Sequence, residues 1–419
     1  MFIESKEAFD MVLYKRERYL NKMRGFYDAC DIIKVITGIR RCGKSSILEM
    51  VKDELLQKGV KEENIIFISL DKKGYISIKT AEELEKVIDS KIISKGINYL
   101  FIDEIQNVKN FEVLINAYRE EGNFSIFITG SNSYLLSGEL MTKLTGRYLE
   151  FEVLPLCFDE YCEMKSFYGK SVDKNPMIEL NNYIIEGGFP RAILLDNPID
   201  KRTYTKGIVL EIFDKDIKKR AKIKDTESFE VVRRFVINNF GSSISLKSIQ
   251  DELKKQNVSI TRTTLKKYIS ILVNAKILYE CDRFDIKSKK SLTGEKKYYL
   301  ADSSLYFSIN TDNRINYGPC LENIVYLYAK SKDYDVSVGR IGKLECDFIL
   351  RDIEMNYSYV QVAFTILSSK DTEDREYTPL EDIRDNYPKY VLTTDYLLQK
   401  RNGIIHKNLM DFILKGAKF

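Results

Sequence analysis

The chain has 419 residues, of which 44% are hydrophobic and 31% are charged, a composition typical of globular proteins that predicts about three domains. Its 66 Lys and Arg residues barely outnumber its 62 Asp and Glu residues, so the net charge of +4 does not by itself indicate a nucleic-acid partner. The single histidine, His406, argues against a Ser-His-Asp hydrolase and against a metal site built from histidines.

The first third of the chain alternates short apolar runs with amphipathic stretches. The expected strands are residues 32–37, 65–70, 99–103, 125–129 and 148–153. The expected helices between them are residues 47–58, 81–94, 111–120 and 134–144. This alternation predicts an α/β fold with a parallel sheet that is covered by helices on both faces.

A glycine-rich loop follows the first expected strand and matches G-x(4)-G-K-[ST] in full. Gly38 and Gly43 permit backbone conformations that turn successive N–H groups toward a phosphate at the positive end of a helix. Lys44 adds a charge near the β- and γ-phosphates, and Ser45 offers a hydroxyl to Mg²⁺. The residues predicted to bind ATP in this loop are Gly38, Ile39, Arg40, Arg41, Cys42, Gly43, Lys44, Ser45 and Ser46.

The third expected strand ends in two carboxylates, Asp103 and Glu104. Asp103 is predicted to hold Mg²⁺ together with Ser45, either directly or through water. Glu104 is predicted to orient and activate the attacking water, a role that hydrolysis requires. Lys44 and Glu104 are therefore the first two predicted catalytic residues.

The polar residues after the fourth expected strand leave two interpretations open. Thr129, Ser131 and Asn132 are each candidates to face the γ-phosphate, and Asn132 is included among the predicted nucleotide-binding residues. Equally, Ser131 or Asn132 could cap the next helix. Arg147 is the third predicted catalytic residue, as a transition-state arginine acting in cis or across a subunit contact, with a surface ion pair as the alternative.

The middle of the chain is helical and then basic. Expected helices 158–166, 177–186 and 202–219 are separated by a Gly-Gly-Phe-Pro break at residues 187–190. Helices 229–239, 246–256 and 262–275 then precede a two-stranded ribbon at residues 277–300, an arrangement that resembles a winged helix. Residues 247–297 hold thirteen Lys or Arg against six Asp or Glu, which concentrates the positive charge there.

This basic segment predicts double-stranded DNA as a candidate partner. The residues that could contact phosphates are Arg262, Lys266 and Lys267 on the recognition-like helix and Lys287, Lys289 and Lys290 on the ribbon. The alternative is a solvated face on a domain used for protein packing or nucleotide gating. The final block, residues 321–419, mixes one helix (321–330) with several strands.

Seven motifs, in order, resemble those of the AAA-like ATPases of bacteria and archaea that carry a C-terminal domain of unknown function. They lie at residues 35–45, 101–106, 129–133, 144–147, 153–156, 187–191 and 345–348. The resemblance implies ATP and Mg²⁺ as cofactors and places residues 187–191 near the nucleotide base, where the residues themselves indicate only a helix break. It also implies a P-loop ATPase core (1–155), a helical lid (156–225), a winged helix (226–300) and a nuclease-like domain (301–419).

In the implied nuclease-like domain, Glu322, Glu345, Asp347 and Gln361 are similar to the PD-(D/E)XK constellation. The chain departs from that pattern because Gln361-Val362-Ala363 stands where the pattern has Glu-x-Lys. A neutral amide is a poor ligand for a hard cation, and Ala363 cannot stabilise a phosphate's charge. A lysine from elsewhere, such as Lys389, could replace it, but we expect a domain without nuclease activity that is used for binding.

Other features predict a cytoplasmic protein with no membrane partner. The first ten residues include Glu4, Glu7 and Asp10, which do not suit a secretory signal. No segment approaches the roughly 18 uninterrupted apolar residues of a membrane-spanning helix. The seven cysteines include no C-x-x-C pair, which favours reduced, buried thiols.

The sequence therefore predicts a Mg²⁺-dependent ATPase whose cycle moves other parts of the chain on DNA or on a protein client. The alternative is a DNA-binding or regulatory switch that is gated by ATP, has little turnover and carries an inactive nuclease-like domain. The residues favour neither client over the other and leave the oligomeric state open.

Overall fold

The computed structural model describes residues 12–92, 96–130, 146–218, 223, 225–288, 290–310 and 314–419. These residues form two compact units, Met1–Val153 and Leu154–Phe419, which are described separately below. The predicted helix 134–144, together with Ser131 and Asn132, lies outside the described residues, as does Lys289. The finer predicted division of the chain into four domains stays a prediction.

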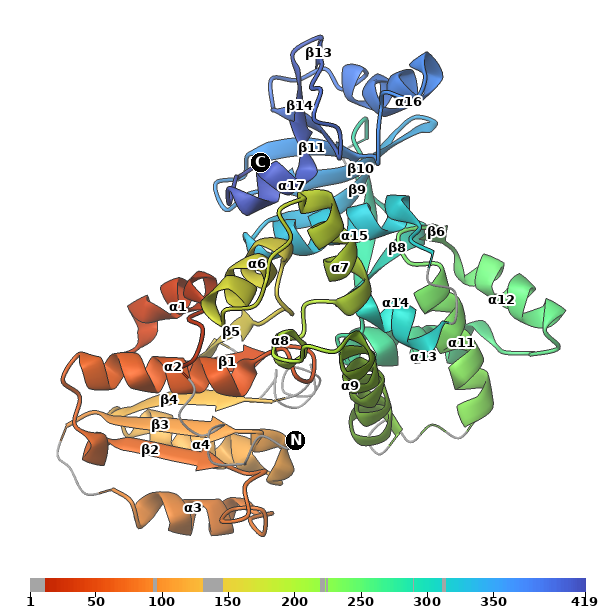
Figure 1. The fold of residues 1–419 in the computed structure, drawn as a ribbon. Coiled ribbons are helices and arrows are strands. Elements are labelled where there is room, and N and C mark those ends of the chain that lie inside the picture. The colour runs from red at the N-terminus through yellow and green to blue at the C-terminus, as the bar shows by residue number, and fades with distance from the viewer. Residues whose placement is uncertain are drawn as a thin grey trace. The chain divides into compact units, whose positions relative to one another are not determined.

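Unit 1 is built on a five-stranded parallel sheet with the strand order β2-β3-β4-β1-β5 (Figure 1). The strands are β1 (Ile33–Thr37), β2 (Ile65–Ser69), β3 (Asn98–Asp103), β4 (Phe124–Thr129) and β5 (Tyr148–Glu152). Every residue of β1, β3 and β4 is buried, as expected for central strands covered on both faces. The predicted α/β fold class is confirmed.

The helices of unit 1 cover both faces of this sheet (Figure 1). They are α1 (Glu17–Met23), α2 (Lys44–Gln57), α3 (Ala81–Asp89) and α4 (Phe111–Glu120). Leu84, Ile88, Phe111 and Ile115 of α3 and α4 share one apolar core with alternate residues of the strands. Because neighbouring strand residues point to opposite faces, the stacked rings of Phe67, Phe101 and Phe127 lie on the other face, with α2.

Unit 2 begins with helices and continues with a nine-stranded mixed sheet. Its first helices are α6 (Phe158–Phe167), α7 (Pro176–Glu186), α8 (Pro190–Ile193), α9 (Pro198–Glu211), α11 (Thr226–Asn238), α12 (Leu246–Lys255) and α13 (Arg262–Asn274). The later helices are α14 (Ser304–Ile309), α15 (Tyr317–Ser331), α16 (Lys370–Glu381) and α17 (Leu409–Leu414). The predicted helix 202–219 starts earlier, at Pro198, and passes into a π-helical turn at Ile212–Lys218.

The sheet of unit 2 has the order β13-β14-β12-β11-β10-β9-β7-β8-β6. Its strands are β6 (Ser243–Ile244), β7 (Leu278–Asp285), β8 (Lys290–Leu300), β9 (Asp335–Ile341), β10 (Leu344–Arg351), β11 (Tyr357–Val362), β12 (Lys389–Thr393), β13 (Lys400–Arg401) and β14 (Ile404–Asn408). The predicted ribbon is present as the hairpin β7–β8. It is not a separate two-stranded ribbon, because β7 also pairs in parallel with β9. One sheet thus crosses the predicted boundary at residue 300.

The Gly-Gly-Phe-Pro segment ends α7 and packs against the end of β8. Asp302 is buried and accepts a hydrogen bond from the Gly188 N–H at 2.6 Å. A Cβ on Gly187 would stand 2.0 Å from the Asp302 carboxylate, and a Cβ on Gly188 would stand 2.1 Å from the Leu156 carbonyl oxygen. Close backbone approach therefore explains both glycines, and the following side chain, Phe189, is fully buried.

Candidate functional site

The glycine-rich loop connects β1 to α2 at the carboxyl end of the parallel sheet. Gly38 has φ +143° and Gly43 has φ +107°, backbone conformations that side chains other than glycine disfavour. A Cβ on Gly38 would also lie 2.1 Å from the Val153 carbonyl oxygen and 2.8 Å from Cys42 Sγ. Local geometry thus requires both glycines of the motif.

Lys44, the first residue of α2, folds back over the loop. Its side chain is buried, and Nζ donates to the carbonyl oxygens of Gly38 at 3.1 Å and Ile39 at 3.2 Å. A phosphate oxygen is a stronger partner for an ammonium group than a neutral carbonyl, because both partners then carry charge. The ammonium is thus held over the backbone of the glycine-rich loop.

Three hydroxyl groups converge on the carboxylate of Asp103, which ends β3. Ser45 Oγ and Thr129 Oγ1 donate to Oδ1 at 3.0 and 2.5 Å, and Ser69 Oγ donates to Oδ2 at 3.4 Å. Burial raises the pKa of Asp103, while the hydrogen bonds from Thr129 and Ser45 lower it. Carboxylate and hydroxyl oxygens are ligands that Mg²⁺ accepts, so Asp103 and Ser45 fit a magnesium ion beside the loop.

Glu104 follows directly and adopts a left-handed backbone conformation with φ +60°. Its N–H donates to Thr129 Oγ1 at 3.0 Å, and its carboxylate accepts a hydrogen bond from Gln106 Nε2. A non-glycine residue in this conformation costs on the order of 1–3 kcal/mol and is often found at functional sites. Of the three candidates to face the γ-phosphate, Thr129 contacts both acids; the other two lie outside the described residues.

Within a single chain, Arg147 lies away from the glycine-rich loop. Its carbonyl accepts from the Ile33 N–H at the amino end of β1, whereas the loop follows the carboxyl end of that strand. Its guanidinium donates to Asn116 Oδ1 at 3.2 Å and lies 4.0 Å from Glu120 Oε1. These contacts match the surface ion pair that was the alternative role for Arg147. A catalytic role across a subunit contact stays a prediction.

Arg16 supports the loop and was not predicted from the sequence. Its guanidinium is buried, donates to the Cys42 carbonyl oxygen at 3.1 Å and stacks over Tyr19 with 4.5 Å to the ring centroid. The residue lies outside every motif of the sequence, so no local signal could have identified it. The loop's own Ile39 and Cys42 are fully buried.

Unit 2 assembles the acidic residues that the sequence singled out. Lys297 of β8 lies between them, with Nζ 2.9 Å from Glu322, 2.9 Å from Glu345 and 3.8 Å from Asp347. Burial raises the pKa of Glu322 and of Asp347. Together with Gln361, whose Oε1 accepts from the Asp347 N–H at 3.2 Å, the three acids line a cavity of about 590 Å³.

The lysine that joins these acids is not Lys389, the residue suggested by the sequence. Lys389 Nζ donates to the Asp385 carbonyl at 3.0 Å, because β12 places it near the turn after α16. Among the described residues, no group of three His, Cys, Asp or Glu side chains has the geometry of a metal site.

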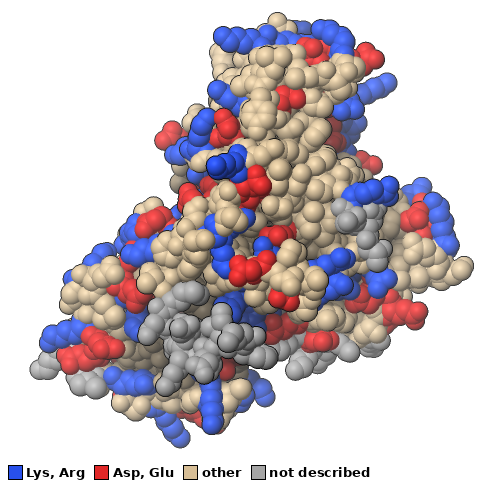
Figure 2. All heavy atoms as spheres, in the orientation of Figure 1, with Lys and Arg blue, Asp and Glu red and all other residues tan. Residues whose placement is uncertain are grey.

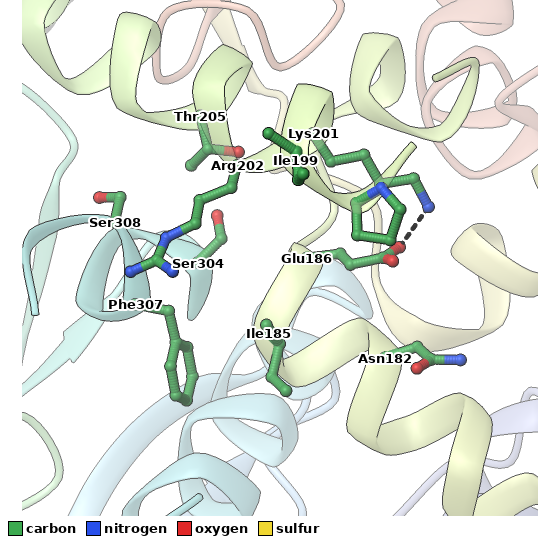
Figure 3. A pocket seen from close by; sticks show the side chains of 11 residues that line it. Asn182, Ile185, Glu186, Ile199, Lys201, Arg202, Thr205, Ser304, Phe307 and Ser308 are labelled. Atoms are coloured by element: carbon green, nitrogen blue, oxygen red, sulfur yellow. Dashed lines mark hydrogen bonds and ion pairs between the residues drawn. The ribbon is translucent and has the colours of Figure 1, made fainter. Parts of the chain in front are cut away.

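A second cavity of unit 2, of about 390 Å³, lies among α7, α9 and α14 (Figure 3). Ile185, Ile199 and Phe307 supply its apolar lining, and the ion pair between Lys201 and Glu186, at 2.6 Å, forms part of its rim. Within the parts of the chain described above, no helix is both long and apolar enough to span a membrane.

Comparisons with known proteins match both units. A family described as "AAA domain" matches residues 31–162, and a family described as "Domain of unknown function (DUF8612)" matches residues 177–314. An uncharacterized protein of Haemophilus influenzae is 36% identical over 407 residues, covering 96% of this chain and 99% of the relative. An uncharacterized protein of Methanocaldococcus jannaschii is 32% identical over 335 residues, covering 74% of this chain and 72% of the relative.

Among solved structures, the Aeropyrum pernix ORC2 protein in ADPNP–ADP complexes is similar with a TM-score of 0.40 and 12% identity. The similarity covers 74% of this chain and 90% of that one.

Proposed function

Because this chain belongs to the same family as the uncharacterized Haemophilus influenzae and Methanocaldococcus jannaschii proteins and has an AAA domain at residues 31–162, we propose that it binds ATP and hydrolyses it with Mg²⁺. One observation carries the proposal: a complete phosphate-binding loop, with Lys44 folded over it, stands beside the Ser45–Asp103 hydrogen bond. An AAA domain supports nucleotide binding; hydrolysis is the further step proposed here.

In the proposed reaction, the N–H groups of the loop and the Lys44 ammonium bind the β- and γ-phosphates. Ser45 and Asp103 would hold the magnesium ion, which when bound neutralises developing charge on the phosphate oxygens. Glu104 orients the attacking water and accepts its proton, and the Thr129 hydroxyl fixes the Glu104 backbone. Gln106, hydrogen-bonded to the Glu104 carboxylate, holds that side chain before nucleotide arrives.

The test compares ATP hydrolysis and ATP binding in the wild type, Glu104→Gln and Lys44→Ala. Glu104→Gln should keep its ATP affinity and lose at least about 10²-fold in turnover, the low end for removing a general base. Lys44→Ala should lose binding itself. A matched control is Glu85→Gln, which removes an exposed acid of α3 and should keep the wild-type rate. Equal phosphate release from the wild type and Glu104→Gln would remove Glu104 from the mechanism.

We propose double-stranded DNA as the client of this ATPase. The observation that favours DNA is the exposed basic face of α13, where Arg262, Lys266 and Lys267 lie in the solvent. Steady-state ATPase rates with and without duplex DNA test the coupling. Stimulation is the expected result, and indifference to DNA would favour a protein client.

A further inference from the structure

The turns of two neighbouring hairpins lie side by side where strands β7 and β9 end, on one side of the nine-stranded sheet. β7 and β9 run in parallel, with Phe284 opposite Gly339 and Asp285 opposite Arg340, so both strands end at the same edge. The Ile286 N–H donates to the Arg340 carbonyl oxygen at 3.0 Å. A Cβ on Gly342, in the β9–β10 turn, would stand 3.7 Å from Lys287 Nζ in the β7–β8 turn. The two turns are thus in direct contact.

Four exposed cations lie on these turns and the strand ends beside them, and we call them the basic edge. They are Lys287, Lys290, Arg340 and Lys343. Within the described ranges, none of the four forms an ion pair. The only side-chain hydrogen bond of Arg340 that the structure gives is to the Gly342 carbonyl oxygen, at 2.9 Å.

Three acids of the same two hairpins already have side-chain or backbone partners. Glu295 pairs with Arg283 at 2.6 Å, and Glu345 pairs with Arg283 at 2.7 Å and with Lys297 at 2.9 Å. The Asp285 carboxylate accepts the N–H groups of Lys287 and Ser288 at 2.9 and 3.2 Å. Arg283 and Lys297 therefore pair with Glu295 and Glu345, whereas Asp285, opposite Lys290 and Arg340 in the sheet, keeps its charge beside the basic edge.

The surrounding surface can be compared on one face of the molecule. Figure 2 shows Lys and Arg interspersed with Asp and Glu over the face that it draws. A net charge of +4 on 419 residues gives no broad positive field, so a polyanion must be attracted by a local concentration of cations. The basic edge is such a concentration, built from two segments about 50 residues apart in the chain.

We propose that the basic edge binds the phosphate backbone of double-stranded DNA, so that the β7–β8 turn acts together with the β9–β10 turn and not with α13 alone. This inference rests on the DNA binding proposed above and assigns part of that binding to the basic edge. It adds Arg340 and Lys343, which lie outside the predicted winged helix, to the residues that contact DNA. Exposed lysines without ion pairs bind phosphates without giving up an internal partner.

The experiment is a salt titration of the full chain against a fluorescein-labelled 25-base-pair duplex, followed by fluorescence anisotropy. The test variant is Lys287→Ser/Lys343→Ser, which removes one cation from each turn. A comparison variant, Lys266→Ser/Lys267→Ser, removes the same charge from α13, the other surface proposed to contact DNA. Thermal melting of all three proteins shows that the surface substitutions leave the fold intact.

Each neutralised phosphate contact contributes about 0.9 to the slope of log affinity against log salt. The test variant should therefore lose about 1.8 from the slope, so that the wild type loses about twelvefold more affinity than the variant between about 50 and 200 mM salt. The α13 variant should also lose slope, because Lys266 and Lys267 belong to the surface proposed above to contact DNA.

Three results would overturn the inference. If the α13 variant loses slope and the edge variant does not, the basic edge is not the contact, although the DNA proposal stands. If the wild type shows no binding, or binding that is flat with salt, both proposals fail. If the edge variant loses binding to phosphatidylserine vesicles while the wild type ignores the duplex, the partner is a membrane surface. None of these results bears on ATP hydrolysis, which is measured separately.

Discussion

At the scale of the residue, the contact between Arg16 and Cys42 determines how the loop presents its backbone. A peptide unit is planar and trans, so a Cys42 carbonyl held by Arg16 turns the Gly43 N–H to the opposite side. That N–H belongs to the group proposed to bind phosphate. Arg16 is thus a positioning residue, because it acts through the loop and not on the nucleotide.

Arg16→Ala should weaken ATP binding about tenfold or more, since a hydrogen bond from a charged group contributes about 1.5–3 kcal/mol. Arg16→Lys should restore part of that affinity, because an ammonium keeps a donor but loses the planar stacking on Tyr19. The control is Arg24→Gln, which breaks a 2.6 Å ion pair with Glu54 of α2 and should lower thermal stability without changing ATP affinity. Equal effects of Arg16→Ala and Arg24→Gln on ATP affinity would contradict a positioning role.

Asp302 makes stability depend on pH. Burial raises its pKa to about 6, although the hydrogen bonds from Ser304 and Gly188 lower it. Between the unfolded value of about 3.9 and this folded value, the folded state holds a proton that the unfolded state has released. The free energy of unfolding should therefore fall by up to about 3 kcal/mol as pH rises from about 4 to 6, and Asp302 adds no further change above that range.

Urea unfolding of the wild type and Asp302→Asn across this pH range measures the effect. Asparagine does not titrate, so the stability of the wild type relative to the variant should grow as the pH is lowered. Parallel curves for the two proteins would show that Asp302 does not titrate in this range.

At the scale of the element, Lys297 joins β8 to α15 and β10. Its side chain is 5% exposed, and the acids around it raise its pKa above the ordinary lysine value, although burial opposes them. Since Lys297 forms ion pairs with Glu322 and Glu345, the acidic pocket already contains a cation from the protein itself. The nuclease-like domain and its lack of activity stay predictions.

Lys297→Met should destabilise the chain by about 3–5 kcal/mol, because it leaves the carboxylates buried without their cation. Lys296→Met, on the next residue of β8, removes a surface lysine that pairs with Glu280 and Asp282 and should cost about 0–1 kcal/mol. Urea denaturation of both variants makes the comparison. If the two variants were equally stable, the buried cluster would contribute nothing to holding β8 in place.

At the scale of the whole molecule, two separate units carry the two proposed activities. Unit 1 holds the phosphate loop and the acids at the carboxyl end of a parallel sheet, the edge where such sheets bind ligands. Unit 2 holds the acidic pocket and the basic edge on one mixed sheet. The pairing of β7 with β9 gives unit 2 both surfaces, because it brings the predicted ribbon and the C-terminal strands into one sheet.

The sequence by itself determined the strands of unit 1, the loop from Gly38 to Ser45 and the two carboxylates that follow β3, because each of these features is recognisable within one short segment. Strand periodicity and positive-φ glycines are consequences of local sterics, which any short segment carries with it. Only the tertiary structure decided that Arg16 supports the loop, that Arg147 lies at the other end of β1 and that Lys297 enters the acidic pocket. The partners in those contacts come from separate segments and are selected by packing and burial, which no local pattern encodes.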